Sequence, residues 1–440
     1  MYTEKVIPYK EQGPIRDTRL LYRLENILPK LMQEEAIDMW IVTSQENNED
    51  PVMKTVLPSP MLNSSRRTIL IFFQKEDGTV ERLAIGRPGG PLSKAYNEVW
   101  TNPKDSDWAH YASLSGAKIE VQGQPETQME CLKRIITERN PKKIGLNYAE
   151  TDSAGYGHGY GDGISHGSFN LISQSIGTEN ASKIVSASRL CVRWLESRSP
   201  EEMTTLKGVV SLTAEIVKRS LSSNIVHPGV STASSVSSWI MQHCQDLGLK
   251  PWFPFYIVVR REGSPGLHGD TIIQEGDILH LDMGVEYLGL CSDIQCNAYV
   301  LKRGESEPPS GIKALFQQGK RLQDIVADEF TRSRTGNEIL ANSLKKAQSE
   351  GINGMIYTHP IGYFGHAPGA GIGYVDNQKG VKGWGEHPVY DNTAYALELN
   401  VSGPIPEWGG SKLMLGIETD VIFTGGKIHY YFRQQELFTI

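Results

Sequence analysis

The sequence predicts an α+β protein of two domains, and three observations support this prediction. The chain has 440 residues, which is too long for one ordinary hydrophobic core. Patterns typical of helices and of strands alternate through roughly the first 180 residues, as in an α/β domain. Beyond residue 186, two helices followed by strands occur twice over similar lengths. We therefore expect one domain over residues 1–185 and a second over residues 186–440.

The N-terminal region begins with an amphipathic helix over residues 16–35, where leucines and isoleucines recur at helical spacing. The patterns that follow predict strands at 39–43, 68–73, 80–85 and 142–147 and a helix near 126–138. The glycine-rich segment 154–167 matches neither the phosphate-loop nor the dinucleotide-binding pattern. We interpret it as a flexible loop before a helix, with His158 and His166 exposed to solvent.

The second region repeats one order of elements. Ser199, Pro200 and Glu202 supply an N-cap, a first-turn proline and a capping glutamate, so they predict a helix that runs to about Ser220. The other patterns predict helices at 231–248, 311–331 and 335–349, strands at 255–259, 393–400 and 414–423, and a hairpin at 278–301. We expect two structurally related halves, 195–302 and 310–440, that pack their strands together.

The composition excludes several classes of partner. Hydrophobic residues make up 39% and charged residues 22%, which is typical of a soluble globular protein. The net charge of −7 and the lack of a Lys/Arg block argue against nucleic acid as a partner. No apolar run approaches the ~18 residues of a membrane span, and no signal peptide is visible. The five scattered cysteines are expected to be reduced thiols, so we expect a cytoplasmic protein without a membrane partner.

Two aspartates stand within apolar strand patterns between residues 278 and 301. These patterns flank a short centre at Tyr287 and Leu288, which predicts a β-hairpin. A turn centred between those two residues would place Asp282 directly opposite Asp293, with Cα atoms about 4.5–5.5 Å apart. Two buried carboxylates that close repel each other unless a cation lies between them, so the pair suggests a metal site. The spacing alone also fits two unrelated surface acids.

The C-terminal half places further acids and histidines in unusual positions. Glu398 and Glu418 stand within apolar strand patterns, although an outward-facing glutamate on an edge strand is the alternative for each. His359 and His366 flank a stretch whose glycines allow close backbone approach. Together these residues add carboxylates and imidazoles, which are metal ligands, to the aspartate pair.

In order and spacing, these residues resemble the metallopeptidase family of methionine aminopeptidase, aminopeptidase P and prolidase. That family shares the pita-bread fold with creatinase. Its metal ligands follow the order Asp, Asp, His, Glu, Glu, which is matched here by Asp282, Asp293, His359, Glu398 and Glu418. The resemblance implies a C-terminal pita-bread domain that carries catalysis. It also implies an N-terminal α/β domain similar to the non-catalytic domain of creatinase and aminopeptidase P.

The resemblance also implies a role for each site residue. Asp282 would bind one metal ion and His359 the other, while Asp293 and Glu418 would bridge the two. Glu398 would be both a ligand and a proton shuttle. The remaining catalytic residues would be His366 and His268. His366 matches the second histidine of the family's His motif, and His268 lies ahead of the hairpin. Both would hydrogen-bond the substrate carbonyl and the tetrahedral intermediate.

The function that this resemblance implies is hydrolysis of an N-terminal peptide bond of short peptides by a metal-bridging hydroxide. The cofactor would be two divalent metal ions, because four carboxylates and one imidazole form an oxygen-rich site that suits Mn first and also Co, Zn or Fe. The two-domain layout favours Xaa-Pro substrates over the removal of methionine. The family also suggests a homodimer.

Several neighbours of the ligands depart from the family pattern. No proline follows Glu398, Gly416 stands where aminopeptidase P and prolidase carry an arginine, and Met355 stands where aminopeptidase P has an additional histidine. Ala367 follows His366, where aminopeptidase P has an acid. The pocket residues therefore do not support Xaa-Pro specificity. Two alternatives remain: a creatinase-like C–N hydrolase of a small amide or amidine, and a pita-bread binding module without catalysis.

Overall fold

A computed structural model of the chain describes residues 6–87, 89–104, 122–150, 160–264 and 266–440. It contains two compact units. The N-terminal unit is Pro8–Leu195, and the C-terminal unit is Glu196–Ile440 together with Val6 and Ile7. Both units mix helices and strands, which confirms the α+β prediction. None of the described helices is long and apolar enough to cross a membrane. All five cysteines are buried, and none forms a disulfide.

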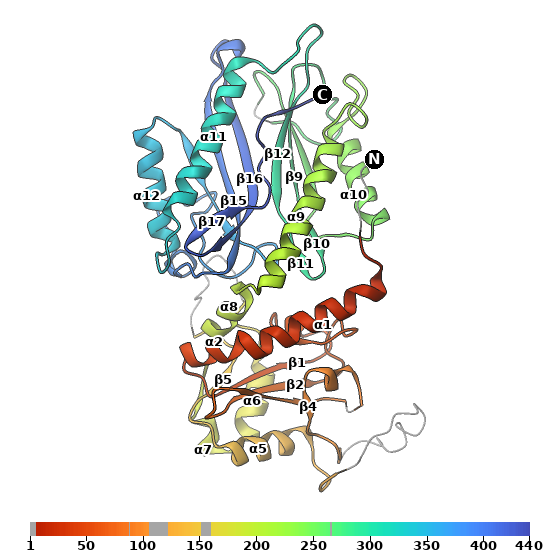
Figure 1. Cartoon of the computed structure of the whole chain (residues 1–440), viewed down its shortest axis with the longest axis vertical. Coiled ribbons are helices and arrows are strands. Elements are labelled where there is room, and N and C mark those ends of the chain that lie inside the picture. Colours follow the sequence, from red (N-terminus) through yellow and green to blue (C-terminus); the bar gives the residue numbers. More distant parts are fainter. Residues whose placement is uncertain (1–5, 88, 105–121, 151–159, 265) are drawn as a thin grey trace. The chain divides into compact units, whose positions relative to one another are not determined.

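The N-terminal unit is built around a mixed sheet whose described strands have the order β4-β3-β2-β1-β5-β6 (Figure 1). The strands are β1 (Met39–Ser44), β2 (Thr68–Gln74), β3 (Val80–Ile85), β4 (Asn97–Glu98), β5 (Ile144–Leu146) and β6 (Ile184–Ser186). The helices are α1 (Tyr9–Asn26), α2 (Leu28–Glu34), α3 (Met53–Val56), η1 (Pro91–Lys94), α5 (Gln128–Arg139), α6 (His166–Ser175), α7 (Thr178–Ala181) and α8 (Ser188–Glu196). Apolar residues such as Ile41, Ile71 and Leu132 fill its core.

The glycine-rich segment can be followed only in part. Residues 151–159, which include His158, lie outside the described residues. Ser165 caps helix α6, because its hydroxyl accepts the backbone N–H of Ser168. His166 is exposed as expected, but it is the first residue of that helix rather than part of a loop.

Three long helices of the C-terminal unit begin with a capping box that the sequence contains. Ser199 and Glu202 form the expected capping box at the start of α9. Thr232 and Thr335 cap two further helices in the same way. The helices are α9 (Pro200–Ser220), α10 (Ala233–Asp246), α11 (Ser310–Glu329), α12 (Gly336–Ser349), η2 (Trp384–Glu386) and η3 (Pro406–Trp408).

The large sheet of the C-terminal unit joins two similar halves. The first half contributes β8 (Tyr256–Arg260), β9 (Ile278–Met283) and β12 (Ile294–Tyr299), and the second contributes β13 (Gly354–Ile356), β15 (Thr393–Pro404) and β16 (Lys412–Thr424). Their order is β13-β15-β16-β12-β9-β8, so β12 and β16 meet in the middle (Figure 1). This order agrees with the predicted halves. The remaining strands are β7 (Lys250–Pro251), β10 (Val285–Tyr287), β11 (Leu290–Cys291), β14 (His359–Pro360), β17 (Lys427–Tyr430) and β18 (Phe438–Thr439).

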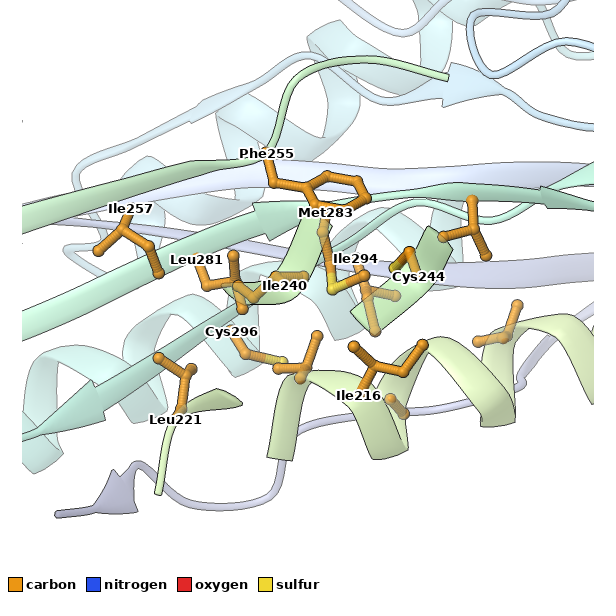
Figure 2. Close-up of a cluster of buried hydrophobic side chains, with 14 of the residues drawn as sticks. Ile216, Leu221, Ile240, Cys244, Phe255, Ile257, Leu281, Met283, Ile294 and Cys296 are labelled. Carbon is orange, nitrogen blue, oxygen red and sulfur yellow. The ribbon is translucent and has the colours of Figure 1, made fainter. Parts of the chain in front are cut away.

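Strand alternation separates a helix-covered face from a polar face of this sheet. Leu281 and Met283 of β9 pack with Ile294 and Cys296, against residues of α9 and α10 such as Ile240 (Figure 2). Leucines and valines of β15 and β16 pack in the same way with residues of α11 and α12. Because alternate side chains point to opposite faces, the residues between these apolar ones share the other face. We call this second face the carboxylate face, because the acids described below lie on it.

The predicted register of the hairpin is wrong. Asp282 pairs with Gln295 rather than with Asp293, and Tyr287 pairs with Leu290. The turn is therefore centred between Leu288 and Gly289, which have φ angles of 53° and 76°. Two positive φ angles are typical of a type I′ turn, whereas a leucine rarely adopts one. Asp293 still shares a face with Asp282, because it lies two residues before Gln295 and is a diagonal neighbour.

Gly284 is expected to be required for the close approach of the two hairpin strands beside the aspartates. A Cβ atom there would lie 2.2 Å from the carbonyl oxygen of Ser292 and 2.3 Å from Nε1 of Trp252. We predict that Gly284→Ala lowers the free energy of unfolding by about 1–3 kcal/mol in chemical denaturation. Gly208→Ala is the control, because a Cβ atom at Gly208 in α9 meets nothing within 4 Å and should stabilise the helix by about 0.5–1 kcal/mol. Equal stability of the Gly284→Ala variant and the wild type would contradict this prediction.

Candidate metal centre

One row of paired residues crosses four adjacent strands of the carboxylate face. Glu398 of β15 pairs with Glu418 of β16, Glu418 pairs with Gln295 of β12, and Gln295 pairs with Asp282 of β9. Directly paired residues have Cα atoms about 4.5–5.5 Å apart, so their side chains crowd together. Asp293, immediately before β12, joins this row from the same face. The structure therefore brings together all four acids that the sequence singled out.

His359 completes the cluster. Its Nε2 atom lies 3.7 Å from Oδ2 of Asp293, 3.7 Å from Oε1 of Glu418 and 4.0 Å from Oε2 of Glu398. The Nδ1 atom is 3.0 Å from the carbonyl oxygen of Pro360, so the Nδ1–H donates there. That hydrogen bond leaves the lone pair of the neutral ring on Nε2, toward the carboxylates. One ligand atom from each of Asp293, His359 and Glu418 lies within 4.8 Å of the others.

Burial makes this cluster electrostatically costly without a cation. Desolvation raises the pKa of Asp282 to about 7. Desolvation raises the pKa values of Asp293, Glu398 and Glu418 well above their ordinary values, and the negative charge of neighbouring carboxylates adds to the effect. Side-chain hydrogen bonding acts in the opposite direction, as where Gln295 donates to Glu398 at 2.5 Å. Like charges that share a dry site in this way disfavour the ionised state.

The carboxylate oxygens of the cluster that lack a hydrogen-bond partner are suited to bind divalent metal ions. Three buried carboxylate oxygens, Oδ1 of Asp282, Oδ1 of Asp293 and Oε1 of Glu418, have no hydrogen-bond partner. A buried polar atom without a partner is costly, and a metal ion removes this cost. Carboxylate oxygens with one imidazole nitrogen suit Mn, Fe, Co or Zn better than a metal that prefers thiolates. The residues present therefore fit the metal centre that the sequence predicted.

The two predicted catalytic histidines lie in different surroundings. The ring of His366 is exposed and lies beside the cluster, with its centroid 4.7 Å from that of His359 and 5.2 Å from that of Trp252. His268 is also exposed, but among the described residues its ring makes no hydrogen bond or ring contact. The structure thus places His366, but not His268, next to the proposed ligands.

Sequence reasoning missed three residues that make hydrogen bonds to the proposed ligands. Asp420 lies two residues after Glu418 on the same face of β16, and its Oδ2 accepts the backbone N–H of Asp293 at 2.9 Å. Thr358 accepts the backbone N–H of Glu398 and donates to its carbonyl oxygen, both at 3.0 Å. Gln295 is the third. Period-two alternation from Glu418 and Asp293 could have found Asp420 and Gln295, because both lie two residues along the same face.

Asp420 is expected to tune the metal affinity without being a ligand. Residues that orient ligands typically change metal affinity by about 10–100-fold when they are mutated. We predict that Asp420→Ala weakens Mn²⁺ binding by about this factor in calorimetric titration, while Asp420→Asn, which keeps an acceptor oxygen, loses less. Unchanged affinity in Asp420→Ala would show that the contact with Asp293 has no such role.

A buried ion pair supports the loop between His359 and His366. Nη1 of Arg198 lies 3.4 Å from Oε1 of Glu202, and both side chains are fully buried. The guanidinium also stacks over the ring of Tyr363, 4.8 Å from its centroid. It comes so close to Gly362 that a Cβ atom there would lie 2.9 Å from Cζ of Arg198. The start of α9 therefore fixes the loop that carries both histidines.

Gly416 occupies the position where the family pattern has an arginine, and other side chains fill the space. A Cβ atom at Gly416 would lie 2.7 Å from Oε1 of Gln295 and 2.8 Å from Cε1 of His280. Met355, at the other departure, pairs with Asn400, whose amide donates to the hydroxyl of Tyr357. The surroundings of the candidate centre therefore differ from the pattern expected for Xaa-Pro peptidases.

One large sheet built from two similar halves, with helices on one face and a cluster of acids on the other, is typical of a pita-bread metallopeptidase, and the comparisons with known proteins agree. The chain belongs to metallopeptidase family M24, whose family model matches residues 205–424. The uncharacterized peptidase YqhT of Bacillus subtilis is 27% identical over 160 residues, which is 36% of this chain and 40% of that relative's length. The predicted family is therefore confirmed.

Solved structures share the fold at low sequence identity. An X-Pro aminopeptidase from Thermotoga maritima has a TM-score of 0.61 at 14% identity over 93% of this chain and 100% of that chain. A Xaa-Pro dipeptidase from Bacillus anthracis has a TM-score of 0.57 at 16% identity, over 97% and 100%. The N-terminal domain of the FACT complex subunit SPT16 from Cicer arietinum also has a TM-score of 0.57, at 12% identity, over 95% and 96%. The predicted pita-bread fold is confirmed, but the fold alone does not define the activity.

Proposed function

We propose that this protein is a metal-dependent peptidase that hydrolyses the N-terminal peptide bond of short peptides in its C-terminal unit. The observation that carries the proposal is the buried cluster in which Nε2 of His359 faces the carboxylates of Asp293 and Glu418. Buried carboxylates that lie this close disfavour folding unless a cation offsets their charge. Their presence in one cluster therefore points to a functional site. We further propose that the N-terminal unit takes no part in the chemistry.

The proposed ligands are the five residues that the sequence suggested, namely Asp282, Asp293, His359, Glu398 and Glu418. Two divalent ions held by them would polarise the substrate carbonyl and lower the pKa of water. Mn²⁺ is the first choice on the basis of the oxygen-rich donor set. The Nδ1–H bond to Pro360 keeps the His359 ring in the tautomer that ligation requires.

The protein side chains would supply proton transfer and orientation. Glu398 is partly exposed, and burial raises the pKa of its carboxyl, so it can accept a proton from water and give it to the leaving amine. Gln295 fixes one carboxylate oxygen of Glu398 by donating to it. His366, exposed beside His359, can donate to the oxygen on which negative charge develops. We propose the same role for His268, which would have to reach the substrate from the loop ahead of β9.

We further propose Xaa-Pro peptides as substrates and a homodimer as the assembly. Xaa-Pro peptides remain the first substrates to test because of the fold, although Gly416 and Met355 replace the expected pocket residues. The homodimer implied by the family can be tested by light scattering. A binding module without catalysis is the second candidate, because the fold is shared by a domain of SPT16, which is a subunit of the FACT complex. The complete set of candidate ligands favours the peptidase.

A peptide panel tests the proposal. Purified protein loaded with Mn²⁺ or Co²⁺ is offered Xaa-Pro and Xaa-Ala dipeptides and tripeptides, with and without chelator. We expect release of the N-terminal residue that stops when the chelator is added and returns with metal. Hydrolysis of small amides or amidines instead of peptides would favour a creatinase-like hydrolase. Stable metal loading without turnover of any peptide would contradict the proposal and favour a binding module.

A further inference from the structure

Arg260 is a buried cation at the end of β8 on the carboxylate face. Its strand neighbours Ile257 and Val259 pack in the core below α9 and α10, so the alternate residues Val258 and Arg260 point to the other face. The side chains of His280 and Asp282 in β9 lie on that same face, and Val258 pairs directly with His280. Arg260 thus shares a surface with the candidate metal centre.

No anion within the described part of the chain balances this charge. Arg260 is only 8% exposed, its Nε atom is buried without a hydrogen-bond partner, and it forms no ion pair with a described acid. Its neighbour Arg261 differs, because Nε and Nη2 of Arg261 bind both oxygens of Asp277 at 2.7 Å. A guanidinium stays charged in proteins, so burying one without a partner is costly. Such a site is suited to an anion that arrives from solution.

The described side chains between Arg260 and the candidate metal centre include no acid. The ring of His280 is buried, and its Nδ1 atom lies 3.2 Å from Oδ1 of Asn297, which is uncharged. His280 and Gln295 are the side chains that fill the space beside Gly416. Tyr357 interacts electrostatically with Arg260, and its backbone N–H donates to the carbonyl oxygen of Glu398 at 3.1 Å. Uncharged side chains, the apolar Val258 and Ile278 among them, therefore separate the guanidinium from the carboxylates on this face.

The separation suits a small substrate. Tyr256 pairs with Asp282, and Arg260 lies four residues further along β8, about 13 Å at the usual rise of a strand. The long arginine side chain covers part of this distance. The face is open to solvent nearby, because Tyr256 is 53% and Met414 40% exposed. When the scissile peptide bond of a substrate lies at the metal centre, a carboxylate of the residue after that bond could reach the guanidinium of Arg260.

We propose that Arg260 binds a carboxylate of the substrate on the leaving-group side of the scissile bond and so selects short acidic or dipeptide substrates. This inference rests on the proposed peptidase function and names its substrate class. The carboxylate is either the C-terminus of a dipeptide or the side chain of an aspartate or glutamate. Arginine suits this task because its planar guanidinium can bind both oxygens of a carboxylate at once.

Three matched peptides test the proposal and separate the two sources of the carboxylate. Ala-Ala has a terminal carboxylate, Ala-Ala-amide has none, and Ala-Glu-amide has one on its side chain. We expect the metal-loaded wild type to prefer at least one carboxylate peptide over Ala-Ala-amide by about 100-fold in kcat/KM, because loss of one partner of a buried charge pair has effects of this size. Preference for Ala-Ala identifies the terminus, and preference for Ala-Glu-amide identifies the side chain.

Substitution of Arg260 should remove this preference by raising KM for the carboxylate peptide. Arg260→Met is expected to treat all three peptides alike, so the ratio of kcat/KM between a carboxylate peptide and Ala-Ala-amide should fall to about one. Arg260→Lys keeps the charge but not the planar donor pair, so it should keep about a tenth of the preference. Arg303→Gln, which changes the net charge equally at an exposed position of the same unit, should keep all of it. If Arg260→Met does not fold, the proposal is tested by the kcat/KM ratio between carboxylate peptide and Ala-Ala-amide in the wild type and in Arg260→Lys.

The outcomes separate this inference from the peptidase function. Equal hydrolysis of all three peptides by the wild type would overturn the role of Arg260 and leave the peptidase standing. Hydrolysis of none would contradict the peptidase. In that case, peptide binding to the metal-free protein, measured by calorimetry, still tests the role of Arg260. Binding of Ala-Ala or Ala-Glu-amide to the wild type but not to Arg260→Met would support this role. Equal binding of every peptide by both proteins overturns it.

Discussion

Asp293→Ala and Glu418→Ala are each expected to lower kcat/KM for peptide hydrolysis by more than about 1,000-fold. Both acids lie in the tightest part of the cluster, with one oxygen each 3.7 Å from Nε2 of His359. Mutating residues that merely orient ligands already costs about 10–100-fold, so the loss of a proposed ligand itself should exceed this. The loss should appear in kcat and in metal content together.

Steady-state kinetics with Mn²⁺ in excess provide the test of these two variants. Glu436→Ala is the control, because Glu436 is an exposed acid of the same unit, and its replacement should leave the rate unchanged. Circular dichroism would show that the variants are folded. Activity of Asp293→Ala or Glu418→Ala within tenfold of the wild type would contradict the assignment of these residues as ligands.

Asp282→Asn is expected to be more stable than the wild type without metal and less stable than the wild type with metal. In the metal-free protein the pKa of Asp282 is raised to about 7, mainly by burial. The unfolded chain therefore releases this proton at lower pH than the folded chain does, and the free energy of unfolding falls as pH rises from about 4 to about 7. At pH 8 the metal-free Asp282→Asn variant should be more stable than the wild type by about 2–4 kcal/mol, since one pKa unit corresponds to about 1.4 kcal/mol.

Metal should invert this difference, because a ligand that binds only the folded state stabilises it by mass action. The wild type should gain more from Mn²⁺ than Asp282→Asn, which lacks one ligand. Asp277→Asn is the control: Asp277 is a buried acid that is paired with Arg261, so its replacement should destabilise the protein with or without metal. Denaturation at pH 5 and pH 8, with and without Mn²⁺, would test this. Destabilisation of the metal-free protein by Asp282→Asn at pH 8 would contradict it.

The sequence was most informative where the signal is local. The capping box of Ser199 and Glu202 predicted the start of α9, because cap and helix lie within four residues. Apolar runs likewise predicted β15 and β16, since nearly all residues at the centre of both strands are buried. The order and spacing of the five proposed ligands then indicated the family.

The features that the sequence did not predict depend on contacts between distant segments or on an unusual backbone conformation. The hairpin register was missed because Leu288 adopts a positive φ, which propensity disfavours for leucine. The contact of Asp420 with the backbone of Asp293 spans 127 positions and depends on β12 and β16 being neighbours. Arg260 stands out only after burial and the absence of an ion partner among the described residues are known.

Elemental analysis of protein purified without chelator, beside the Asp293→Ala variant, tests the metal centre most directly. Two divalent ions at the proposed ligands predict a content near two Mn, Fe, Co or Zn per chain. This content should fall sharply in Asp293→Ala, whose missing carboxylate would otherwise bridge both ions. Little or no metal in the wild type, even after reconstitution with Mn²⁺ or Co²⁺, would contradict the metal centre.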